Sequence, residues 1–100
     1  MKEIPKGFRL NNKDYVVWHK NFGSGMKGYS QPATKEMWVA DTDRQGNKYS
    51  KDERFQTFWH ELTHCTIYEM NRKTLTGWRD EVWVAEFSEL LNEAITTARF

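Results

Sequence analysis

The chain has 100 residues, of which 38% are hydrophobic and 15% aromatic, and its formal net charge is +1. This length predicts one domain over residues 1–100 with a thin core, to which a bound metal ion would add stability. Lys and Arg are scattered among Asp and Glu, which argues against nucleic acid as the partner, and no stretch approaches the apolar length of a membrane span. A lone cysteine, Cys65, and a polar N-terminus lead us to expect a soluble cytoplasmic protein.

Two short strands are predicted in the N-terminal half, at residues 15–18 and 37–40, because both segments are rich in β-branched or aromatic side chains. Residues 1–14 are polar and give no clear element. Several glycines and a proline mark residues 20–35 as a loop. Residues 41–49 read as a polar turn, and their last two residues are candidates for the return strand of a hairpin.

A helix is predicted to begin after Ser50, which together with Glu53 forms a capping-box pattern. Nothing interrupts the helical pattern until about Asn71. A polar connection then leads to Asp80, which is placed to cap a second helix running to about Arg99. These elements predict an α+β fold, with a small sheet in the N-terminal half followed by a helix and a packed C-terminal helix.

The first helix contains the pattern His-Glu-x-x-His at residues 60–64. Residues i and i+4 share one face of a helix, so His60 and His64 can reach the same tetrahedral ion, which makes zinc the expected cofactor. Glu61 lies about 100° around the helix from His60. It is therefore placed beside the metal as a general base, not as a ligand.

The two faces of this helix support a metal site. Apolar side chains gather on one side and polar ones on the other, where both histidines lie. Cys65 falls on the apolar side and reads as a small hydrophobic residue. Tyr68 follows His64 by one turn, so it is a candidate donor to a reaction oxyanion, although such a residue is more often a packing group.

Residues 58–65 resemble the active-site helix of zincin metallopeptidases, in particular the small bacterial and phage-encoded proteins related to the ImmA/IrrE and SprT-like groups. The resemblance extends over residues 37–91 and is specific at the five-residue motif. It implies a minimal zincin-like fold. It also implies that the strand at residues 37–40 is a sheet edge that pairs with an extended peptide substrate.

A catalytic zinc ion usually takes three protein ligands and a water molecule. No histidine follows His64, and His19 reads as a surface residue, so the third ligand is expected to be a carboxylate on the second helix. Glu81 is our choice, because it continues an apolar stripe through Val84, Ser88, Leu91 and Ile95 that is expected to face inward. Glu86 and Asp80 remain as alternatives, while Glu86, Glu89 and Glu93 together read as a solvated face.

The sequence therefore predicts a zinc-dependent metallopeptidase that hydrolyses peptide bonds, with Glu61 as the base and a peptide or protein as its substrate. A dedicated protein partner fits the small size of the chain, which leaves little room for a deep cleft. The alternative is a non-catalytic zinc protein that keeps the site for stability or regulation. A third reading is a small interaction protein that binds no metal.

Overall fold

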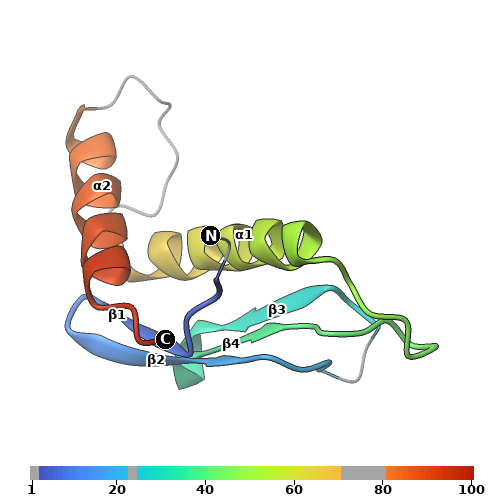
Figure 1. Cartoon of the computed structure of the whole chain (residues 1–100). Coiled ribbons are helices and arrows are strands. Elements are labelled where there is room, and N and C mark those ends of the chain that lie inside the picture. Colours follow the sequence, from blue (N-terminus) through green and yellow to red (C-terminus); the bar gives the residue numbers. More distant parts are fainter. Residues whose placement is uncertain (1–2, 23–24, 71–80) are drawn as a thin grey trace.

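One four-stranded mixed sheet carries both helices on the same side (Figure 1). The computed structural model describes residues 3–22, 25–70 and 81–100, without the side chains of Glu81 and Val84. The strands are β1 (Gly7–Leu10), β2 (Lys13–Trp18), β3 (Gly28–Gln31) and β4 (Glu36–Val39), in the spatial order β1-β2-β4-β3. β2 and β4 run parallel, and the two outer pairs are antiparallel.

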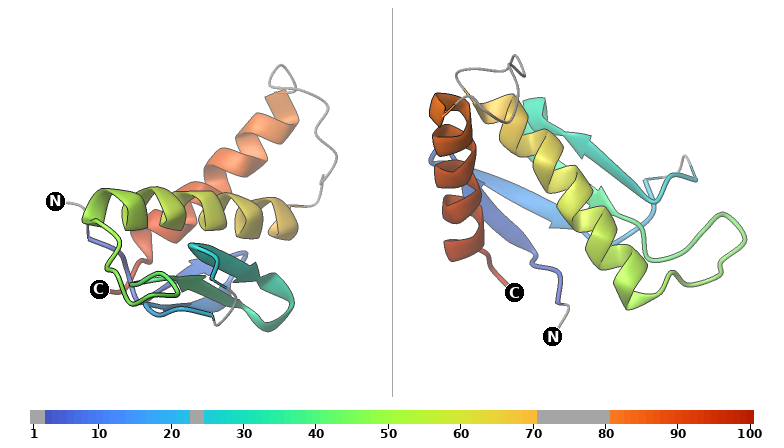
Figure 2. Two further views of the ribbon diagram at one scale, coloured as in Figure 1. Left: turned by 90° about the vertical axis from the view of Figure 1, so that its right-hand side faces the viewer. Right: turned by 90° about the horizontal axis from the view of Figure 1, so that it is seen from above.

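Helix α1 spans Lys51–Glu69 and helix α2 spans Glu81–Thr96, while a short 3-10 helix η1 (Pro32–Thr34) joins β3 to β4. In the views of Figure 2, α1 lies along the sheet and α2 touches it only near its C-terminal end. Helix α1 packs against β3 and β4, and α2 packs against β1. The predicted order, a sheet followed by two helices in an α+β fold, is confirmed.

The start of α1 follows the predicted capping box. The N–H group of Glu53 donates to Ser50 Oγ, and the N–H group of Ser50 donates to Glu53 Oε1, both at 3.1 Å. The helix ends at Glu69, because Met70 has an extended backbone with ψ of 143°. The predicted helix is therefore correct to within two residues at its C-terminal end.

The core fills the space between the sheet and α1. Alternation along the strands sends every second side chain inward, and α1 contributes the face that was predicted to be apolar. On that face Phe58, Leu62 and Cys65 are buried, and the partly buried Trp59 packs against them. The buried apolar cluster consists of Ile4, Phe8, Leu10, Tyr15, Val17, Met37, Val39, Phe58, Leu62, Cys65 and Ala94.

Two strands were missed from the sequence. β1 lies within the segment read as featureless, and its turn into β2 is made by Asn11 and Asn12, both with positive φ angles (53° and 63°). An Asn-Asn pair in that conformation is a hairpin signal. β3 lies within the segment read as a loop. Its first residue, Gly28, lies so close to α1 that a Cβ atom there would come within 2.4 Å of Thr57 Cγ2.

The predicted sheet edge was also wrong. Residues 37–40 correspond to β4, which lies between β2 and β3. The edge beside α1 is therefore β3. The return strand expected at the end of the polar turn is reduced to one isolated bridge between Thr42 and Lys48.

Helix α2 differs from the prediction in its length and in its inward face. It ends at Thr96, three residues early, and Arg99 instead pairs with β1 through a hydrogen bond from its N–H group to the Gly7 carbonyl oxygen (2.7 Å). Of the predicted inward stripe, Leu91 packs against the core, whereas Ser88 and Ile95 are exposed. Leu90 and Ala94 also pack against the core. Only the last turns of the helix reach β1.

One carboxylate of the expected solvated face has a structural role. Glu93 accepts hydrogen bonds from the backbone N–H groups of Asn11 and Asn12, at 2.7 and 2.8 Å. It therefore fastens the β1–β2 turn to α2. Neither of the helices described here is long and apolar enough to cross a membrane.

Candidate metal centre

His60 and His64 project from one face of α1, and their rings converge. The two Nε2 atoms lie 3.2 Å apart, and both side chains are exposed. Two nitrogen ligands of a tetrahedral zinc ion, each about 2.0–2.1 Å from the metal, lie about 3.3 Å from one another. The observed separation therefore fits a shared zinc ion without a change of helix geometry.

Glu61 lies between α1 and β3 and is buried, with 7% of its surface exposed. The hydroxyl of Ser30 donates to Glu61 Oε1 at 2.5 Å and lies 3.2 Å from the Glu61 carbonyl oxygen. The other carboxylate oxygen, Oε2, lies on the side of Gly28, 3.1 Å from where a Cβ atom of that residue would be. One oxygen of Glu61 is thus held by β3, and the absence of a side chain at Gly28 makes room for the carboxylate.

A groove of about 630 Å³ joins these groups. It runs between β3 and the second half of α1, and it is lined by Met26, Gly28, Tyr29, Ser30, Pro32, His60, Glu61, His64, Ile67 and Tyr68. The two histidines and the carboxylate therefore face one common space. Tyr68, which is 44% exposed, lines the same space, as its proposed role as an oxyanion donor requires.

The exposed edge of β3 borders the groove. Residues 27 and 40 form a hydrogen-bonded antiparallel pair, because the Ala40 N–H group donates to the Lys27 carbonyl oxygen at 2.8 Å. Antiparallel pairs alternate, so Tyr29 also bonds to β4, while the backbone groups of Gly28 and Ser30 point away from it. These outward N–H and C=O groups are the ones that an added strand would use.

A third metal ligand is not found among the residues that the structure describes, which contain no group of three His, Cys, Asp or Glu side chains suited to a metal. Asp80 and the Glu81 side chain lie outside the described part, so Glu81 stays a prediction, and the stripe that supported it is inward at Leu91 but not at Ser88. Glu86 lines a separate hollow on α2 with Val82, Ala85 and Glu89.

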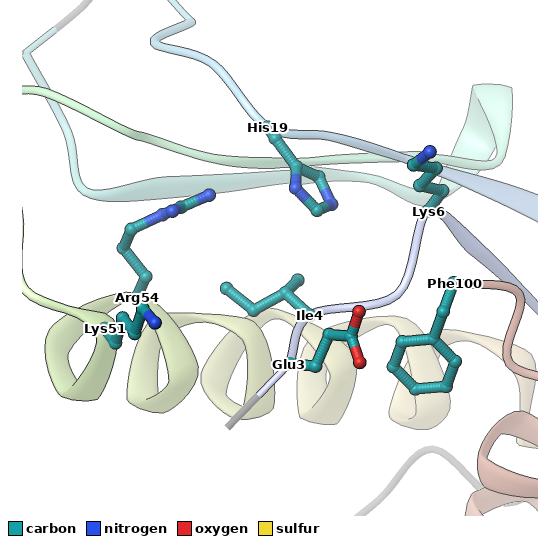
Figure 3. A pocket seen from close by; sticks show the side chains of 7 residues that line it. All are labelled: Glu3, Ile4, Lys6, His19, Lys51, Arg54 and Phe100. Atoms are coloured by element: carbon teal, nitrogen blue, oxygen red, sulfur yellow. The ribbon is translucent and has the colours of Figure 1, made fainter. Parts of the chain in front are cut away.

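His19 lies in another pocket, shown in Figure 3. Its Nε2 atom is 2.9 Å from the Pro5 carbonyl oxygen, and its surroundings include Lys51 and Arg54 from the first turns of α1. His60 and His64 lie about two to three turns farther along the helix. His19 is partly buried in this pocket, not fully exposed as the sequence reading of a surface residue implied, and it does not line the groove of His60 and His64.

A second buried carboxylate, Glu69, anchors the far end of α1. It accepts hydrogen bonds from the Tyr15 hydroxyl at 2.5 Å, from Lys35 Nζ at 2.7 Å and from Lys13 Nζ at 3.3 Å. Burial opposes ionisation of Glu69, but these three donors outweigh it and hold the pKa below the ordinary value. Burial likewise raises the pKa of the Tyr15 hydroxyl, which remains a donor. The network fixes the C-terminal end of α1 to the sheet.

Cys65 is completely buried one residue after His64. Burial raises the pKa of its thiol to about 12, so it stays protonated at neutral pH. This agrees with the expectation that Cys65 is a core residue. Ser30, Gly28 and Glu69, in contrast, were not recognised from the sequence, because their roles depend on which strand lies beside α1.

Comparisons of the chain with protein-family models, with curated proteins and with solved structures find no match. The assignment of the site therefore depends on its residues and their geometry.

Proposed function

We propose that this protein is a zinc-dependent peptide hydrolase in which His60 and His64 are metal ligands and Glu61 is the general base. The proposal rests on one observation. The Nε2 atoms of the two histidines lie 3.2 Å apart, and the buried Glu61 carboxylate lines the same groove. A direct hydrogen bond between the two rings also accounts for this distance, so the buried carboxylate beside them is the feature that favours a zinc site. We retain Glu81 as the proposed third ligand.

When bound, zinc supplies Lewis acidity that activates water and polarises a carbonyl group. The protein's own contribution is to handle protons. Glu61 accepts a proton from water at Oε2 and delivers it to the departing amine. Ser30 holds Oε1 at 2.5 Å, so the carboxylate keeps one orientation through both transfers.

The edge of β3 provides a means of holding the substrate. An extended peptide that pairs with Gly28 and Ser30 would run along the groove, with its backbone close to the Glu61 carboxylate. This transfers the edge-pairing role from the strand named in the sequence analysis to β3. A peptide or protein substrate is favoured over a small molecule because the edge recognises backbone groups.

A non-catalytic zinc protein is the second candidate function. It draws support from the small ligand set, since the described residues bring only two histidines and the Glu61 carboxylate to the groove. A regulatory protein that binds a partner strand on β3 would use the same edge without hydrolysis. Zinc binding is common to both candidates, and catalysis separates them.

The test is Glu61→Gln, with Glu89→Gln as the control, because Glu89 is an exposed glutamate on α2. Glu61→Gln should keep zinc and the fold but reduce hydrolysis of a peptide library by about a hundredfold or more, the range of a lost general base. Glu89→Gln should match the parent. Hydrolysis that survives Glu61→Gln undiminished would exclude Glu61 as the general base, and a complete loss of zinc would make Glu61 a ligand.

A further inference from the structure

The groove of about 630 Å³ adjoins a second hollow, and the two together form a site with two halves of different chemistry. His60, Glu61 and Gly28 lie where the halves meet, because they line both. One half is a hollow of about 400 Å³ at the first turns of α1, whose other lining residues are Lys27, Glu53, Gln56 and Thr57. The other half extends past His64. Besides Gly28, Ser30 and the residues of the metal centre, it is lined by Met26, Tyr29, Pro32, Ile67 and Tyr68.

The half past His64 exposes a large apolar surface. Met26 and Tyr68 are each 44% exposed, and Ile67 and Pro32 are partly exposed. Apart from the metal-centre residues, none of the residues that line it is charged. A charged side chain placed there would lose part of its hydration and meet no charged lining residue outside the metal centre, whereas an apolar one would bury surface favourably.

The half near the start of α1 is polar. Lys27 Nζ lies 3.4 Å from Glu53 Oε2, and both side chains remain about half exposed. Gln56 is also exposed. A substrate side chain of either charge, or a neutral polar one, can stay hydrated here and meet a polar partner. This half is therefore not expected to select for one residue type.

We propose that the site selects extended peptides with a large aliphatic or aromatic residue at one position next to the scissile bond. That side chain occupies the half lined by Met26, Ile67 and Tyr68, while the residues on the other side of the bond are polar and variable. The inference rests on the proposed function, since it names the substrate class of the same groove. Burial of one large side chain gives about a tenfold to hundredfold preference over serine.

Two measurements test the proposal on the zinc-loaded full chain. In the first measurement, a mixed peptide library is incubated with the parent protein, and mass spectrometry identifies the positions of any cleavage. In the second measurement, zinc-loaded Glu61→Gln protein is titrated with labelled peptides. Within each set of four, the peptides differ at a single position, which carries Leu, Phe, Ser or Asp. We expect enrichment of large apolar residues at one position beside the cut, and binding at least tenfold tighter for the Leu or Phe peptide.

Ile67→Ser should reduce that preference to about threefold or less. The control, Ile95→Ser, replaces a 47% exposed isoleucine on α2 and should leave the preference unchanged. Cleavage with no apolar preference beside the cut would overturn the inference and leave the hydrolase standing. Selective binding without any cleavage would support the groove assignment and exclude the hydrolase. Equal binding of all four peptides would also overturn the inference.

Discussion

Replacing Ser30 with alanine removes the hydroxyl that donates to Glu61 Oε1 at 2.5 Å. Because Glu61 is 7% exposed, water cannot readily take the place of the hydroxyl. The carboxylate is left buried with one donor fewer, and its orientation is no longer fixed by β3. Both the stability of the fold and the position of the base should suffer.

The size of the effect follows from the kind of bond that is lost. A hydrogen bond to a charged group contributes about 1.5–3 kcal/mol. Loss of this amount should lower the melting temperature by roughly 6 °C or more in a domain of this size. Because the free protein already makes this bond, kcat/KM should fall through the lost orientation of Glu61, and a misplaced catalytic group costs about tenfold to a hundredfold.

The assay compares kcat/KM and the melting temperature of Ser30→Ala, Ser30→Thr and Ser88→Ala. Ser88→Ala is the matched control, because Ser88 is an exposed serine on α2. Ser30→Thr keeps a hydroxyl and should recover most of the activity. If Ser30→Ala behaves like Ser88→Ala in both measurements, the hydroxyl does not position Glu61.

Two further predictions concern other contacts of α1. Because the pKa of Glu69 is held below its ordinary value of 4.5, this carboxylate stabilises the fold at neutral pH and loses its effect as the pH falls through the lowered pKa. Glu69→Gln should thus flatten the acid side of the curve of unfolding free energy against pH, while Glu89→Gln leaves it unchanged; identical curves would contradict the ionised network. Gly28→Ala should push β3 away from α1, since the new Cβ atom would lie 2.4 Å from Thr57 Cγ2, and lower the melting temperature by several degrees, about 1–3 kcal/mol. Thr57→Ser removes that methyl group, so the double variant Gly28→Ala with Thr57→Ser should recover part of the lost melting temperature. A double variant that melts no higher than Gly28→Ala would point to another cause.

Helix α1 and the convergence of His60 and His64 were predictable because their determinants are local. The capping box of Ser50 and Glu53 sets where the helix begins, and the spacing of four residues between His60 and His64 sets their shared face. Neither depends on the rest of the fold. The prediction that both histidines lie on the exposed side of α1 is confirmed for the same reason.

The surroundings of Glu61 could not be predicted, because they arise from the order of the strands. Nothing in the sequence states that β3 lies outside β4, and only that order brings Ser30 and Gly28 beside α1. A segment of four residues with one aromatic side chain also gives a weak strand signal. The edge strand and the positioning hydroxyl were therefore missed together.

The inward face of α2 was misjudged because periodicity gives a stripe but not how far the helix stays on the sheet. Of the predicted stripe, Ser88 and Ile95 are exposed, whereas Leu91 packs against the core. The helix meets β1 only through its last turns (Figure 2). Such a docking angle depends on the tertiary fold, and no pattern within residues 81–96 specifies it.

The most direct test of the metal centre is the zinc content of purified protein, measured by elemental analysis for the parent, His60→Ala and His64→Ala. We expect about one equivalent of zinc per chain in the parent and a loss of most of it in each variant, because two ligands on one helix cannot substitute for each other. A parent protein that takes up no zinc, or two variants that hold zinc as well as the parent, would contradict the account.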